Sequence, residues 1–75
     1  MTKRQRRTEW NLYAPSWGFK KEDFGRMFMV GENIYIIDGC YPRNPVWTIL
    51  ALDVRQRRYV KVRLLDALKG CERLA

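Results

Sequence analysis

Four short apolar runs separated by turn residues follow Gly25, and this pattern constrains the fold more than any other feature of the sequence. Runs of this length, bounded by glycine, proline, asparagine and aspartate, are typical of strands in a small antiparallel sheet. The last run alternates between two sets of residues: Val60, Val62 and Leu64 against Tyr59, Lys61 and Arg63. Because side chains alternate across a strand, we predict one buried face and one solvent face.

The runs predict strands at residues 26–30, 34–40, 47–54 and 59–64. A tight turn at residues 31–33 joins the first two strands, and Pro42 and Pro45 keep residues 41–45 in a loop, since proline cannot donate a ladder hydrogen bond. A polar turn covers residues 55–58. Leu64, Leu65, Ala67 and Leu68, followed by Gly70, predict a single helical turn with a glycine stop.

These elements indicate a mainly all-β fold, a small SH3-like, partly open antiparallel barrel of four to five strands. An OB-like barrel or a plain sheet is the alternative. A chain of 75 residues is short enough that we expect one core and no second domain. We divide it into a basic arm (residues 1–9), an aromatic irregular lead-in (10–24) and the barrel (25–75).

The arm reads MTKRQRRTE and has no apolar residue after Met1, which predicts a flexible segment. Its cations are candidate phosphate contacts: Lys3, Arg4, Arg6 and Arg7. The alternative is a solvated tail that aids solubility. The net charge of +7 makes a polyanion such as DNA or RNA the expected partner, with an acidic protein surface or a large assembly as the alternative.

A second basic cluster surrounds the predicted turn before the last strand. It offers cations beside a ring that can stack on a base: Arg55, Arg57, Arg58, Tyr59, Lys61 and Arg63. The alternative is an ordinary charged edge strand, whose cations prevent sheet-to-sheet aggregation. In the proline-rich loop, Arg43 is a further candidate contact, or a residue of a plain turn.

Three aromatic residues, Trp10, Tyr13 and Trp17, lie in the lead-in, outside the predicted strands. They are candidates for contacts with a partner, because large rings contribute strongly to binding interfaces. The alternative is that they seal the open side of a small barrel.

Several residue types that catalysis and metal binding need are scarce. There is no histidine, and two cysteines cannot form a zinc site alone, so we expect no enzymatic activity, no metal and no cofactor. Cys40 has no base beside it in the sequence and is interpreted as a small buried apolar residue. The absence of an apolar leader or long apolar run predicts a cytoplasmic protein with reduced thiols and no membrane partner.

The segment FGRMFMVGENIYIIDGCYPRNPVWTILALDVRQRRYVKV, from Phe24 to Val62, resembles short phage-encoded proteins. In that pattern a Phe-bearing strand, a glycine-centred turn and a Tyr-Ile strand precede a Pro-Arg loop and two further strands. The resemblance implies a viral source and a small β-barrel, and it carries no defined activity. The combined hypothesis is a non-enzymatic nucleic-acid-binding protein, host cytoplasmic or virion-borne. A protein-binding module, such as an inhibitor of a host protein or a minor virion component, is the alternative.

Overall fold

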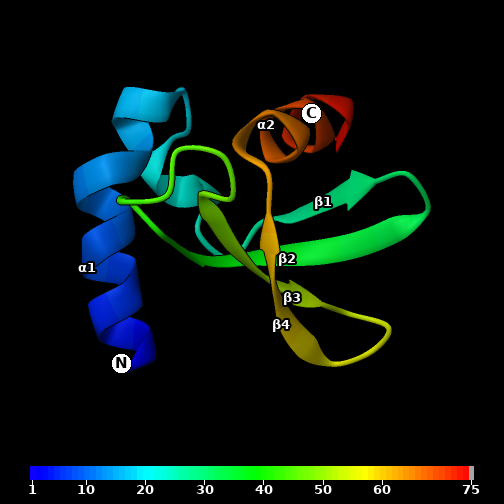
Figure 1. The fold of residues 1–75 in the computed structure, drawn as a ribbon, viewed down its shortest axis with the longest axis horizontal. Coiled ribbons are helices and arrows are strands. Elements are labelled where there is room, and N and C mark those ends of the chain that lie inside the picture. Colours follow the sequence, from blue (N-terminus) through cyan, green and yellow to red (C-terminus); the bar gives the residue numbers. More distant parts are fainter. Residues whose placement is uncertain (75) are drawn as a thin grey trace.

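The computed structural model describes residues 1–74, in which two α-helices flank a four-stranded sheet (Figure 1). The elements in chain order are α1 (Lys3–Tyr13), the 3-10 helices η1 (Ala14–Trp17) and η2 (Lys21–Asp23), β1 (Met27–Val30), β2 (Asn33–Cys40), β3 (Ile49–Asp53), β4 (Arg58–Val62) and α2 (Leu64–Leu74). Ala75, the last residue of the predicted barrel domain, lies outside the described residues.

The sheet is antiparallel, and its strands lie in the order β1-β2-β3-β4. The four predicted strands are therefore confirmed, and β1 and β4 form the two edges of an open sheet. Classification as SH3-like stays a prediction. The third strand begins at Ile49, because the Asn44 side chain holds the preceding loop: its Oδ1 accepts from the backbone N–H groups of Val46 (3.2 Å) and Trp47 (2.9 Å).

One face of the sheet carries the core. Phe28, Ile37, Ile49 and Ala51 are fully buried there, and Val62 is nearly so. Lys61, between Val60 and Val62, is exposed, which confirms the predicted alternation in β4. Helix α2 packs on this core face against β1.

Helix α2 corrects the prediction of a single turn stopped by glycine. Its apolar positions continue at helical spacing from Leu64 through Ala67 and Leu68 to Cys71, so the buried stripe extends past Gly70. Gly70 itself lies inside the helix, where a Cβ atom would stand 2.5 Å from the carbonyl oxygen of Met29. The glycine permits close packing of α2 on β1 and does not end the helix.

We expect Gly70→Ala to destabilise the fold by about 1–3 kcal/mol, because the added methyl group overpacks the contact with the β1 backbone. Urea denaturation followed by circular dichroism measures the change, with Lys69→Ala on the exposed side of the same helix as the control. Alanine is intrinsically the better helix former by about 1 kcal/mol. A gain in stability for Gly70→Ala would therefore show that the contact is loose.

Helix α1 corrects the predicted flexible arm, since residues 3–9 are helical. Thr2 and Gln5 form a capping box: the Gln5 backbone N–H donates to Thr2 Oγ1 (3.2 Å), and the Thr2 backbone N–H donates to Gln5 Oε1 (2.8 Å). Further along the helix Trp10 is fully buried, as is Ala14, the residue that caps the C-terminal end of α1 one turn later. The cap and the buried tryptophan together offset the unfavourable clustering of cations at the start of the helix.

Two contacts fix α1 to the rest of the fold. The Trp10 ring packs against Phe19 and Phe24, and its Nε1 donates to the Lys20 carbonyl oxygen (3.3 Å). Arg6 forms an ion pair with Asp38 (3.0 Å) and donates from Nε to the Asp38 carbonyl oxygen (3.1 Å), where β2 is irregular. These contacts hold the positively charged half of the helix beside the sheet.

Candidate nucleic-acid interface

The sheet face opposite α2, which we call the open face, carries a row of side chains set by the strand register. The row crosses all four strands: Met27, Ile36, Leu52 and Tyr59. Its two ends, Met27 and Tyr59, are 49% and 59% exposed. Lys61 lies on the same face, where it pairs across the two strands with Leu50 of β3. The open face therefore offers an apolar surface that carries one exposed ring and one exposed cation on β4.

The first two turns of α1 supply the cations beside one end of this face. Lys3, Arg4 and Arg7 are exposed, whereas Arg6 is half-buried in its ion pair with Asp38. The Arg7 guanidinium also lies 5.7 Å from the centre of the Phe24 ring. The first turn of α1 has no acidic residue, so its positive helix dipole adds to the field of these side chains.

The β3–β4 turn supplies a second group of cations, and Asp53 shapes it. Asp53 Oδ1 accepts from the backbone N–H groups of Arg55 (3.0 Å) and Gln56 (3.1 Å), and the Arg57 backbone N–H donates to the Asp53 carbonyl oxygen (2.8 Å). Arg57 adopts a φ of 54° within this turn. The side chains of Arg55, Arg57 and Arg58 are all exposed as a result of this geometry.

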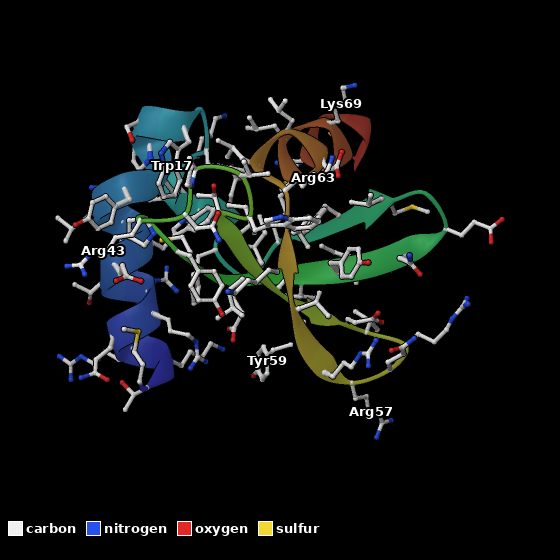
Figure 2. The ribbon with its side chains drawn as sticks, viewed as in Figure 1. Trp17, Arg43, Arg57, Tyr59, Arg63 and Lys69 are labelled. Carbon is white, nitrogen blue, oxygen red and sulfur yellow. The ribbon has the colours of Figure 1, made fainter. Side chains whose placement is uncertain are left out.

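Figure 2 shows how the two groups lie relative to each other. Tyr59 is on the lower side of the molecule in this view, between the N-terminal end of α1 and Arg57. The fold thus brings together two parts of the predicted site that are far apart in the sequence: the α1 cations, and the β3–β4 turn with the ring and cation of β4 that follow it.

Four of the predicted residues lie elsewhere. Arg63 is on the α2 side of the molecule, with its guanidinium 4.9 Å from the centre of the Trp47 ring (Figure 2). Trp10 is fully buried, so its prediction as a partner-binding aromatic is corrected in favour of the sealing role. Tyr13 and Trp17 stack on each other, with ring centres 6.2 Å apart and planes inclined by 16°.

A groove of about 740 Å³ separates α1 from the loop that follows β2. It opens beside the open face, which it meets at Leu50 and Lys61. Its other lining residues come from the N-terminus, from α1, and from the end of β2 and its loop: Met1, Arg6, Glu9, Tyr13, Cys40, Tyr41, Pro42, Arg43 and Asn44. Arg43, predicted as an isolated loop contact, is therefore part of a groove wall.

Cys40 lies in this groove but is almost fully buried, as the sequence predicted. Burial, followed by the nearby Glu9 carboxylate, raises the pKa of the Cys40 thiol from its usual 9.0 to about 12. The folded protein therefore favours the protonated thiol. This preference stabilises the fold below pH 9, and the contribution is lost as the pH rises toward 12.

We expect iodoacetamide at pH 8 to alkylate Cys40 about a thousandfold more slowly in the folded protein than after unfolding, because the thiolate is the reactive form. Peptide mapping by mass spectrometry separates Cys40 from Cys71, which is also buried. Similar rates in both states would mean that the thiol ionises freely in the fold.

Two features of this surface were not predicted from the sequence. The apolar row across the open face depends on the strand register, which no local pattern specifies. The helical form of the α1 cations had a signal: Thr2 and Gln5 have the spacing of a capping box.

Among residues 1–71, whose side chains the structure describes, there is no group of three or more side chains that could hold a metal ion. Over residues 1–74, neither helix has the length and apolar character required to cross a membrane.

Comparison with known proteins identifies a family for the chain. Searches of curated proteins and of solved structures gave no match. The family described as the Y4mA C-terminal domain matches residues 6–66, which is more than half of the chain. This match extends beyond the segment that resembles phage proteins, since it includes most of α1 and the start of α2. The chain therefore belongs to the Y4mA C-terminal domain family.

Proposed function

We propose that this domain is a non-enzymatic nucleic-acid-binding module. The α1 cations and the β3–β4 turn contact phosphates at opposite ends of the open face, and Tyr59 and Lys61 lie between them. Lysine and arginine suit this role because each phosphate contact releases condensed counterions. An exposed ring flanked by cations adds a platform on which a base can stack.

The observation that carries the proposal is the convergence of separate basic segments on one side of the fold. The predicted contacts come from α1 and from residues 55–61, and Tyr59 on the open face lies between the N-terminal end of α1 and Arg57 (Figure 2). Arg58 pairs with Asp53, so its register position is on the opposite face of the sheet, the face of Phe28. Arg6 is a second exception, because its charge is compensated by Asp38. The cations that remain exposed have no acidic residue within the first turn of α1.

The test is fluorescence anisotropy of labelled duplex DNA, single-stranded DNA and RNA over a salt series. We expect the logarithm of the binding constant to fall linearly with the logarithm of salt concentration, with a slope of about −0.9 per phosphate contacted in duplex DNA. The domain is expected to show weak sequence preference, since phosphate contacts carry no sequence information. Undetectable binding at low salt, where the electrostatic attraction is largest, would refute the proposal.

A second candidate function is recognition of a protein partner, and the apolar row on the open face favours it. Ile36 and Leu52 are half-buried and Met27 is half-exposed, which leaves an apolar surface that a partner protein could cover. In that case the surrounding cations would select an acidic partner. Absence of nucleic-acid binding would favour this function.

The location and source of the protein are proposals from the same reasoning. Cys40 and Cys71 are free thiols, which fits a reducing compartment such as the cytoplasm. A viral source stays a prediction of the sequence resemblance.

A further inference from the structure

The groove between α1 and the loop after β2 has the size and chemistry of a small ligand site. Its volume of about 740 Å³ lies within the range of about 300–1,000 Å³ usual for such sites. Cys40, Leu50 and Pro42 contribute apolar surface, and Tyr13 and Tyr41 contribute rings. The charged side chains in the lining are three cations and one carboxylate: Arg6, Arg43, Lys61 and Glu9. An aromatic ligand that carries negative charge fits this combination.

The loop that forms one wall of the groove is held in place by its own hydrogen bonds. The Tyr41 backbone N–H donates to the Thr48 carbonyl oxygen (2.6 Å), and the Asn44 backbone N–H donates to the Tyr41 carbonyl oxygen (3.0 Å). The Thr48 hydroxyl donates to the Asn44 carbonyl oxygen (2.7 Å). Lys61 Nζ lies 4.9 Å from the centre of the Tyr41 ring. A ring fixed in this way loses little freedom when a ligand stacks against it.

The helix wall of the groove depends on the conformation of β2. Gly39 has a φ of 154°, and a Cβ atom at this position would lie 3.5 Å from Cδ of Arg6 and 3.4 Å from Cδ2 of Leu50. These are ordinary van der Waals distances, so it is the backbone conformation at the irregular point in β2, and not the proximity of α1, that favours glycine at this position. Asp38, the residue before it, holds Arg6 against this wall. Arg43 and Lys61 are the lining cations that have no carboxylate as ion-pair partner among residues 1–71, whose side chains the structure describes.

We infer that this groove accepts an unpaired base, and that single-stranded nucleic acid is consequently the preferred ligand of the domain. The base packs against Tyr41, and the adjoining phosphates lie near Arg43 and Lys61. This inference rests on the proposed function and adds the class of nucleic acid to it. From the groove, the strand continues onto the open face by way of Leu50 and Lys61 toward Tyr59.

A base in a duplex is stacked and paired, so it must be extruded before it can enter the groove. An unpaired strand avoids that cost. Stacking on an aromatic side chain is tolerant of base identity, because every base has a π face. The groove therefore discriminates between single and double strands and does not read sequence.

The test uses fluorescein-labelled oligothymidylate of about 12 nucleotides, a length within the usual range of single-strand sites, and a mixed-sequence duplex of equal length. Anisotropy titrations compare the wild-type domain with Tyr41→Ala, Tyr41→Phe and Trp47→Ala. Phenylalanine retains the stacking surface. Trp47 serves as the matched control, because its ring is also partly exposed (42%) but lies outside the groove lining. Circular dichroism confirms that each variant is folded.

We expect the wild type to bind the single strand at least about fivefold more tightly than the duplex, which corresponds to one stacked base. Tyr41→Ala should lose about fivefold or more in single-strand affinity and leave duplex affinity unchanged, whereas Tyr41→Phe and Trp47→Ala keep the preference. Equal binding of both nucleic acids by the wild type, or an equal loss for both in Tyr41→Ala, would overturn the inference and leave the proposed function standing. Binding to neither nucleic acid would overturn both.

Discussion

Replacing Lys3, Arg4 and Arg7 together with glutamine is expected to weaken nucleic-acid binding more than any other change of similar size. If each of the three side chains contacts one phosphate, the salt dependence of duplex binding should become shallower by about 2 to 3 in log–log slope. Affinity at low salt should fall by about a hundredfold or more, because charge-assisted hydrogen bonds to phosphate are lost together with the counterion release. Anisotropy titrations over a salt series measure both quantities.

The control for this variant is a triple glutamine replacement of Lys20, Lys21 and Lys69, which are exposed but lie outside the proposed contacts. It removes the same net charge. Unfolding does not account for the expected loss, since removing cations from the start of a helix relieves an unfavourable interaction with its dipole. Equal losses in both triple variants would mean that binding follows net charge and that α1 has no special role.

Trp10→Ala is expected to cost about 3–5 kcal/mol in the free energy of unfolding, as is usual when a large buried aromatic is truncated. Trp10 is fully buried, packs on Phe19 and Phe24, and is the main apolar contact of α1 with the core. Because small domains have stabilities of only about 5–15 kcal/mol, the variant should be close to unfolded near physiological temperature. Thermal and urea denaturation followed by circular dichroism measure the loss.

Leu12→Ala on the same helix is the matched control, because that side chain is 72% exposed and should change stability by no more than about 0.5 kcal/mol. If Trp10→Ala cost as little as Leu12→Ala, α1 would not be an integral part of the fold.

The sheet could be predicted from the sequence because its signals are local. Alternation in residues 59–64 and the short turn at residues 31–33 each specify a strand or hairpin without reference to the rest of the chain. The extent of α2 could not be obtained in this way. Judged from the local sequence, Gly70 predicts the end of a helix. Only the close approach of the β1 backbone shows that the glycine instead permits packing inside the helix.

The candidate interface was predicted in part. The cations and Tyr59 were identified by residue type, but their arrangement around one face requires the strand register and the position of α1. The arm was predicted to be flexible from its composition alone. The capping box of Thr2 and Gln5 was not recognised, and Trp10 was assigned to a separate segment. The division between Glu9 and Trp10 separated the basic residues from the tryptophan that anchors them.

The sequential order of the four strands has a consequence for how the domain folds. Each strand pairs with its neighbour in sequence, so the sheet can form by closing short loops, at a small entropic cost. The ion pair that fixes α1 instead joins residues 32 positions apart, Arg6 and Asp38. We therefore expect α1 to dock late in folding and to open before the sheet does. The segment that supplies the phosphate contacts of Lys3, Arg4 and Arg7 would then be the one that a bound strand stabilises most.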